Sequence, residues 1–321
     1  ITEGLVGSEM CIRDSTSIEA GAFQYCSNLK SITIPDSVTS IGNSAFNFCT
    51  SLTSIKIPDS VTSIGDYAFS GCTSLTTIEV GAGNLNYTGF NGVLFNKEKT
   101  SLHTYPVSKT GASYTIPDSV TSIGDHAFSY CTNLTSITIP KGVTRIDDYA
   151  FYKCTSLTSI TIGNGVTSIG DHTFDKCEGL TSITIPDSVA SIGDSALNFC
   201  SVLTNVAIGD GVTSIGDYTF WGCTSLTGIT IGNSVTSIGV DAFDSCTSLT
   251  GITIPDSVTS IEKRAFVRCK SLTTVTFLGD APKIKNDAFE GSSPTIYREP
   301  DAKGWGDTLA GRPVKLITEK P

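Results

Sequence analysis

Residues 52–74 read LTSIKIPDSVTSIGDYAFSGCTS, and this unit recurs along the chain with a period of 23 residues. Phenylalanine marks the period best, because Phe69 is preceded by Phe46 and Phe23 at the same step. After a longer interval the series continues with Phe128, Phe151, Phe174, Leu197, Phe220, Phe243, Phe266 and Phe289. A fixed internal period indicates stacked units that share one core, so the 321-residue chain is predicted to form one elongated domain.

Within a unit, the spacing of apolar residues changes. Ile55 and Ile57 flank one polar residue, which predicts a short strand. Val61 and Ile64 favour a second short strand or an extended corner, and Asp66 before an apolar cluster predicts a capped helical turn. The predicted fold class is therefore α/β: a solenoid of about eleven stacked units, with short parallel strands and short helical turns.

The regular apolar positions form the predicted core. Representative core residues are Phe69, Phe128, Phe151, Cys154, Leu157 and Ile162. Ten cysteines follow the phenylalanine position by three residues, and no C-x-x-C metal motif occurs. We expect these cysteines to be free, buried and small hydrophobic residues, with occasional bridging between neighbouring units as the alternative.

Composition excludes several classes of partner. The net charge of -10 and the pI near 4.7 argue against binding to nucleic acid or anionic lipid, since both need clustered Lys and Arg. No run of 18 apolar residues occurs, so no membrane insertion is predicted. No cofactor motif is present.

The two ends depart from the repeat. Residues 5–15 read LVGSEMCIRDS, which resembles a translated sequencing adapter, so residues 1–15 are predicted to be a non-native tail that replaces the true N-terminus. A genuine polar tail is the alternative. The solenoid is predicted over residues 16–291, and residues 292–321 are predicted to be a C-terminal cap with Trp305 and Leu309 as its lid.

One unit is stretched by an insertion at residues 81–113. Its apolar runs, residues 93–95 and 102–105, are separated by polar residues and predict a β-hairpin that projects from the stack. The insertion is either a tolerated bulge or a recognition element. Its candidate binding residues are Tyr87, Phe90, His103 and Tyr105.

A stripe of amphipathic rings is the other candidate binding surface. His126 and His172 share one repeat position, and at two-layer spacing they lie about 10 Å apart, too far to share a metal ion. The equivalent or adjacent positions hold Tyr67, Tyr149, Tyr218 and Trp221. Such rings are favoured at protein interfaces, and ordinary solvent exposure is the alternative.

Two further columns have simple interpretations. The aspartates that form one column of the repeat, such as Asp125 and Asp148, are expected to cap the turn that follows, and no metal site is predicted. Outward Ser and Thr, such as Ser159 and Thr161, suit solvated strands; they also resemble ice-binding solenoids, which remains a remote option. No G-x-S-x-G, phosphate loop or H-E-x-x-H occurs, so the chain is predicted not to be an enzyme.

The form L-x-x-I-x-I-P-x-x-V-x-x-I-G-x-x-A-F-x-x-C-x-x resembles the BspA-like class of leucine-rich repeats, found in bacterial and some protist surface proteins. The resemblance covers residues 16–289, although the Asn ladder of commoner leucine-rich repeats is missing. It implies an extracellular or cell-surface scaffold, adhesin-like, that binds a protein or an extracellular polymer, and we expect a monomer. The alternative is a structural spacer of a larger exported protein whose functional domain lies upstream.

Overall fold

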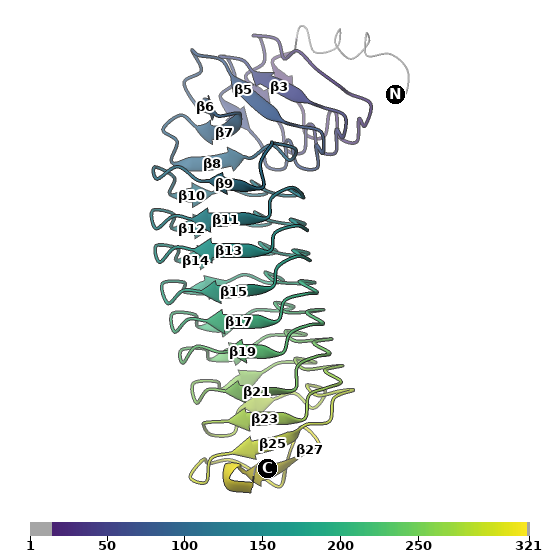
Figure 1. Cartoon of the computed structure of the whole chain (residues 1–321), viewed down its shortest axis with the longest axis vertical. Helices are drawn as coiled ribbons and strands as arrows, with labels where there is room; N and C mark the ends of the chain where they lie inside the picture. The colour runs from purple at the N-terminus through teal and green to yellow at the C-terminus, as the bar shows by residue number, and fades with distance from the viewer. Residues whose placement is uncertain (1–14, 320–321) are drawn as a thin grey trace.

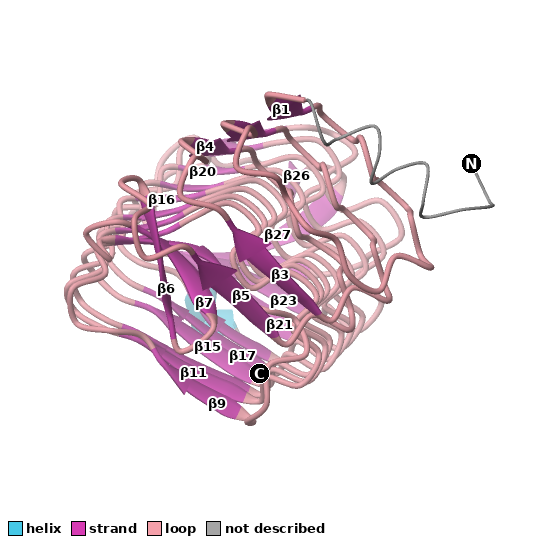
Figure 2. Cartoon of the chain, turned by 90° about the horizontal axis from the view of Figure 1, so that it is seen from above, coloured by secondary structure: helices cyan, strands magenta, loops and turns pink. Residues whose placement is uncertain are grey.

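The computed structural model describes residues 15–319, which form a parallel-strand β-solenoid of about 12 turns. The turns stack along one long axis, with the two ends of the chain at opposite ends of the stack (Figure 1). Seen from above, strands lie on separate sides of the coil and loops join them (Figure 2). Most of the adapter-like stretch, residues 5–14, lies outside the described residues.

The long-strand face carries the first strand of each unit. Its strands alternate buried and exposed side chains, because one face of each strand covers the core. The strands pair in parallel at the repeat period, as in Ile160 against Ile137. They are β3 (Ser54–Ile57), β5 (Thr77–Val80), β9 (Ser113–Thr115), β11 (Ser136–Ile139), β13 (Ser159–Ile162), β15 (Ser182–Ile185), β17 (Asn205–Ile208), β19 (Gly228–Thr230), β21 (Gly251–Ile254), β23 (Thr274–Phe277) and β25 (Thr295–Arg298).

The short-strand face carries the second strand, which is only two residues long in each regular turn. Its isoleucine points into the core and its first residue points outward. These strands are β1 (Ser17–Ile18), β2 (Ser40–Ile41), β4 (Ser63–Ile64), β10 (Ser122–Ile123), β12 (Arg145–Ile146), β14 (Ser168–Ile169), β16 (Ser191–Ile192), β18 (Ser214–Ile215), β20 (Ser237–Ile238), β22 (Ser260–Ile261) and β24 (Lys283–Ile284).

The turn face, defined as residues 66–72 and their equivalents, differs from the prediction. Residues 15–319 contain no α-helix, and their one helical element is the 3-10 turn η1 (Ile317–Glu319). A helix needs consecutive residues with negative φ, whereas Tyr149 and Lys153 have φ of 55° and 56°. Their amides donate across to Asp171 and Asp175 of the next turn, at 2.8 and 2.9 Å. The α/β class with helical turns is therefore wrong.

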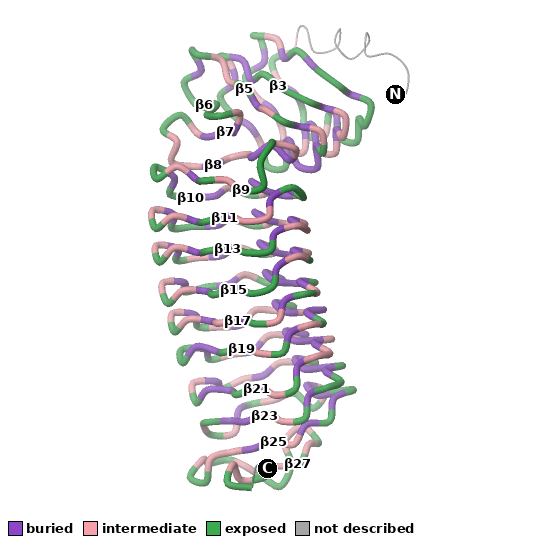
Figure 3. The backbone as a smooth tube through the Cα atoms, viewed as in Figure 1, coloured by how far each residue is buried: buried purple, intermediate pink, exposed green. Residues whose placement is uncertain are grey.

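The core is a set of columns that run along the axis (Figure 3). Phe69, Phe128, Phe151, Cys154 and Leu157 are almost fully buried, and Ile162 is 8% exposed. Neighbouring phenylalanine rings stack, with centroids 4.9 Å apart between Phe128 and Phe151. These side chains have the same direction in every turn, because the backbone repeats.

The cysteines are free within the described range, and all are buried except Cys26. Each buried thiol also donates a hydrogen bond to the carbonyl of the phenylalanine position one turn earlier. The distance from Cys154 Sγ to the Phe128 carbonyl oxygen is 3.0 Å. Ser292 makes the equivalent bond to Phe266 at 2.7 Å. Burial raises the pKa of Cys49 to about 12, so that thiol stays protonated.

The insertion does not project from the stack. It forms an antiparallel meander of β6 (Tyr87–Phe90), β7 (Val93–Asn96) and β8 (Ser101–Thr104), and β8 then pairs in parallel with β10. The predicted hairpin is present as β7 and β8, but Val93, Leu94 and Phe95 are fully buried. Strand β7 faces apolar residues on both sides, because the core continues above and below it.

The C-terminal end is covered by β26 (Thr308–Leu309) and β27 (Arg312–Leu316), and β27 pairs in parallel with β25. Trp305 and Leu309, the expected lid residues, pack against the last core layers. The Trp305 ring lies 5.2 Å from that of Phe277, and its Nε1 donates to the Gly279 carbonyl at 3.3 Å.

Candidate binding surface

Three positions of the turn face vary among the repeat copies, whereas the core positions hardly change. They correspond to residues 67, 70 and 71 of the unit at 52–74. The position of Tyr67 holds Gly21, Ser44, His126, Tyr149, His172, Ser195, Tyr218, Asp241, Arg264 and Asp287 in the other regular copies. Stacking of the core does not require one residue type there, so these positions are free to carry recognition.

Four of the rings that were predicted to form a stripe lie in one row, on four turns of the solenoid. Tyr67, His126, Tyr149 and His172 form one aromatic row, in which successive ring centroids lie 3.9, 4.7 and 4.5 Å apart. The last two pairs are nearly parallel, with interplanar angles of 14° and 10°. In these two pairs each ring covers the face of its neighbour, whereas the rings of Tyr67 and His126 are tilted by 50°.

A second row, which the sequence analysis missed, runs beside the aromatic row. It consists of Tyr25, Phe48, Tyr130 and Tyr152, with centroids 5.3 to 5.4 Å apart. The Phe48 ring lies over Gly71, where a Cβ would come within 2.7 Å of it. Tyr25, Phe48 and Tyr130 each follow a phenylalanine of the core column by two residues. This shared spacing could have predicted the second row from the sequence.

The two rows join into one aromatic surface. The Tyr149 and Tyr152 rings are 5.6 Å apart, and those of His126 and Tyr152 are 6.5 Å apart. Lys153 adds a cation 5.1 Å from the Tyr130 ring centroid and 5.3 Å from that of Tyr152. The aromatic surface, defined as both rows, thus has a basic edge beside the second row.

Tyr218 and Trp221 do not belong to this surface. Ser195 occupies the repeat position between His172 and Tyr218 and interrupts the aromatic row. Tyr218 and Trp221 form a separate cluster with Phe199, with centroids 5.8 and 5.0 Å from that of Trp221. The stripe predicted from sequence is therefore two clusters.

The insertion residues are mostly structural. Tyr105 was expected on a binding face, but it is 3% exposed and stacks on Phe128 at 5.0 Å, because it occupies the phenylalanine column. The Tyr87 hydroxyl accepts from the Ile64 amide at 2.9 Å, and His103 Nε2 lies 3.4 Å from the Ile64 carbonyl oxygen. Of the four candidates only Phe90 is exposed, at 39%, under the Lys99 ammonium.

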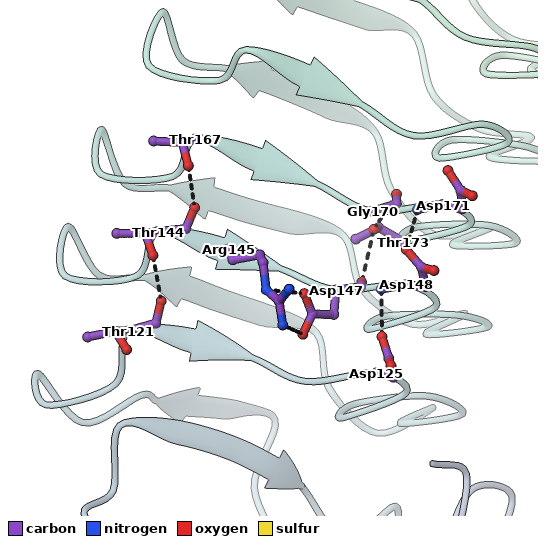
Figure 4. Close-up of polar contacts among 10 residues, drawn as sticks. All are labelled: Thr121, Asp125, Thr144, Arg145, Asp147, Asp148, Thr167, Gly170, Asp171 and Thr173. Carbon is purple, nitrogen blue, oxygen red and sulfur yellow. Dashed lines mark hydrogen bonds and ion pairs between the residues drawn. The ribbon is translucent and has the colours of Figure 1, made fainter.

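A column of aspartates borders the aromatic row on its other side. Figure 4 shows how Asp125 and Asp148 connect successive turns: Oδ1 of one aspartate accepts from the amide of the next, at 3.0 and 2.8 Å. The expected capping of a helical turn is thus replaced by a bond between turns. Burial raises the pKa of Tyr67, and the carboxylate of Asp125 raises it further, so the row has an acidic edge.

Shallow grooves lie beside this column. One, of about 300 Å³, is lined by Arg145, Asp147, Asp148, Gly170, Asp171 and Gly193 among others. Arg145 pairs with Asp147, with Nε 2.7 Å from Oδ1. Burial raises the pKa of Asp147 to about 6, while Arg145 opposes that rise. A second groove of about 680 Å³ lies against the cap and is lined by Asp256, Asp280 and Asp301 among others.

Between residues 15 and 319, no group of three or more His, Cys, Asp or Glu side chains is placed to hold a metal ion. The same part of the chain has no helix long and apolar enough to cross a membrane. The turn face presents aromatic rings, hydroxyl groups and flanking charged side chains.

Comparison with known proteins gives the context of this surface. The family pattern described as "BspA type Leucine rich repeat region (6 copies)" matches over residues 16–110, 105–223 and 167–296. No curated protein sequence gives a match.

Several solved structures are similar. A leucine rich cell surface protein from Faecalibacterium prausnitzii is 37% identical with a TM-score of 0.63, over 67% of this chain and 56% of that one. A leucine-rich repeat protein from Eubacterium ventriosum is 30% identical with a TM-score of 0.62, over 91% of this chain and 84% of that one. Pneumococcal vaccine antigen PcpA, at 24% identity and a TM-score of 0.60 over 82% of this chain and 66% of that one, shares the fold.

Proposed function

Since the chain belongs to the BspA-type leucine-rich repeat family, we propose that it is a non-enzymatic extracellular scaffold that binds another protein through its aromatic surface. The similarity to a cell surface protein supports the extracellular location. The family supplies the scaffold, and the variable turn positions supply the specificity.

One observation carries the proposal: an unbroken aromatic surface crosses several turns at positions that the fold leaves free. Tyrosine offers large contact area and a hydrogen-bonding hydroxyl at a low entropic cost, and it is enriched at protein interfaces. Tyr67 is 37% exposed and the flanking turns add Asp and Lys side chains. Such a mixture suits a protein partner, which can match apolar and charged groups together.

The ring orientation favours a protein over a polysaccharide. Aromatic recognition of sugars places the flat ring face against sugar C–H groups. In the aromatic row, the rings of His126 and Tyr149 lie within 14° of parallel and cover one another, so their faces are not available. The edges and hydroxyl groups of the tyrosines Tyr67 and Tyr149 remain, and these suit hydrogen bonding to a protein surface, whereas both His126 ring nitrogens are buried.

Paired arrays of purified extracellular proteins and of glycans test this proposal, with the chain as the labelled probe. The variant Tyr149→Ser with Tyr152→Ser keeps the fold, because the repeat carries Ser44 and Ser129 at the same positions. We expect protein binding to weaken by about 30-fold, as for an interface residue worth about 2 kcal/mol. The matched control, Thr161→Ser with Thr184→Ser, changes exposed residues of the long-strand face and should bind normally.

Two results would contradict the proposal. The first is binding to the glycan array with none to the protein array. The second is protein binding that both double variants retain equally, which would place recognition away from the aromatic surface.

A further inference from the structure

The insertion divides the solenoid into two separately packed blocks. The N-terminal block, residues 15–80, and the C-terminal block, residues 113–319, have distinct hydrophobic clusters. Strand β7 separates them: Leu94 belongs to the first cluster, and Val93 and Phe95 belong to the second. The first turns are also tilted relative to the rest of the stack (Figure 1).

On the turn face, the backbone bonds that join turns elsewhere are missing at this junction, although the insertion bonds the N-terminal block through Ile78 N–H to the Gly92 carbonyl and Ser108 N–H to the Leu75 carbonyl, at 2.9 and 2.8 Å. In a regular turn, three turn-face amides donate to the next turn, as those of His126, Phe128 and Tyr130 do. The amides of residues 67, 69 and 71 make no backbone hydrogen bond to any described residue. The short-strand sheet is interrupted as well, because β4 ends one sheet and β10 belongs to another.

Side chains hold the turn face together at the junction. Tyr67 contacts His126 with ring centroids 3.9 Å apart, and Phe48 meets Tyr130 edge-on at 5.3 Å. One hydrogen bond joins Ser70 Oγ to Ser129 Oγ at 3.3 Å. The aromatic surface is therefore assembled from both blocks and is continuous only while they are docked.

Two of the three histidines of the chain lie at the junction. His126 is packed between Tyr67 and Tyr149, and neither ring nitrogen has a hydrogen-bond partner among residues 15–319. His103 lies between the Tyr87 ring, at 6.0 Å, and the Ile64 carbonyl, and it also bonds the Thr104 hydroxyl. Both rings are suited to the neutral form.

The charged groups around these rings do not offset the cost of protonation. Asp66, Asp125 and Asp148 flank the row, but these residues bond neighbouring turns. The Asp66 amide donates to Asn43, and Oδ1 of Asp125 and of Asp148 accepts from the amide of the next turn. Burial, with a smaller contribution from His172, lowers the pKa of His126 to about 3. Burial also lowers the pKa of His103, despite opposing effects of the Ile64 carbonyl and Asp66.

We propose that the junction is an acid-sensitive hinge, in which protonation of His126 and His103 releases the N-terminal block from the C-terminal block and divides the aromatic surface between Tyr67 and His126. The hinge itself is independent of ligand; only its effect on binding rests on the proposed function. In the open form a solvated histidine regains its ordinary pKa near 6.5. Lowering the pH to 4.5 therefore shifts the equilibrium toward the open form by about 100-fold for His126 alone.

Small-angle X-ray scattering and hydrogen exchange between pH 7.5 and 4.5 test the hinge on the protein alone. We expect the radius of gyration to rise at low pH. Peptides that contain Ile64, Ile78 and Ser108, whose amides bond across the junction, should lose protection at least 10-fold, after correction for intrinsic exchange, while β13 to β17 stay protected. The double variant His103→Gln with His126→Tyr should not open, because Gln keeps a donor for Ile64 and Tyr is native at residues 67 and 149.

His172→Tyr is the matched control, since it changes the same column inside the C-terminal block, removes only the smaller of the two effects on the pKa of His126, and should still open at low pH. Identical scattering of the wild type at both pH values would overturn the proposal. So would equal opening of the double variant, or uniform loss of protection along the whole chain. If the hinge is confirmed while array binding is absent, only the proposed function fails.

Discussion

The phenylalanine column offers the sharpest test of the packing, through Phe151→Ala. The Phe151 side chain is fully buried and stacks on Phe128 at 4.9 Å and on Phe174 at 5.5 Å. Truncation of a buried phenylalanine costs about 3–5 kcal/mol, and two aromatic pairs are lost with it. We therefore expect about 4 kcal/mol of destabilisation.

Phe151→Leu is the matched control, because Leu197 occupies the same column without interrupting the solenoid. A conservative apolar exchange should cost about 1.5 kcal/mol or less. For about 300 residues the entropy of unfolding is near 0.6 kcal/mol/K, so Phe151→Ala should lower Tm by about 6 °C if the chain unfolds as one unit.

Calorimetry and urea unfolding measure these changes, and hydrogen exchange reports the affected turns if the long array loses cooperativity. A loss below about 1 kcal/mol for Phe151→Ala, or equal losses for the Ala and Leu variants, would refute the reasoning. Either outcome would mean that ring stacking and volume in this column do not determine stability.

Three further outcomes follow from the bonds between turns. Cys154→Ser should stay within about 1 kcal/mol of the wild type in urea unfolding, as Ser292 makes the same bond. Cys154→Val should cost about 0.5–1.5 kcal/mol more than Cys154→Ser, because the Phe128 carbonyl then accepts only from the Cys131 amide. Asp171→Ala should destabilise the protein by about 1 kcal/mol, because the Asp194 amide of the next turn loses its acceptor. Asp171→Asn should cost less, since Asn43 accepts the equivalent bond at 3.1 Å. Equal losses of stability would contradict a role for these side-chain bonds between turns. A histidine whose pKa is lowered in the folded state destabilises the protein as the pH falls below the pKa of the unfolded state. Between pH 7 and pH 5, the free energy of unfolding of the wild type should therefore fall by about 2 kcal/mol relative to that of His126→Tyr. Parallel pH profiles of the two proteins would contradict this prediction.

Sequence reasoning performed best where one turn repeats the last. The period places Ile57, Phe69 and Cys72 in inward columns, and each of them is buried. Both short strands also follow from local spacing, because alternation in a strand reports which side faces the core. The stripe of His126, Tyr149 and His172 could be predicted for the same reason.

The conformation of the turn face could not be read locally. Asp66, Ala68 and Phe69 fit a capped helical turn by spacing alone. The structure instead sets residues such as Tyr67 in the left-handed region, with φ of 61°. In regular turns the amide at this position bonds the next turn, and this bond replaces the one that a helix would make. A contact between turns, absent from any single unit, decides the outcome.

The position of the insertion also could not be predicted from the sequence. Its hairpin was predictable, but its position was not, because β7 is buried by two cores that belong to distant parts of the chain. Tyr105 and Phe90 look equivalent in sequence, yet one fills the phenylalanine column and the other is exposed.

The sequence by itself determined the period, the inward columns and the repeat family. Every copy places apolar residues at the same positions, and stacking of the copies buries all of these positions together. Tertiary structure alone decided that Tyr67 meets His126 across 59 residues, that the second row joins the first, and that the solenoid has two cores. These features depend on the contacts between turns of different sequence and length. The repeating unit contains no information about those contacts.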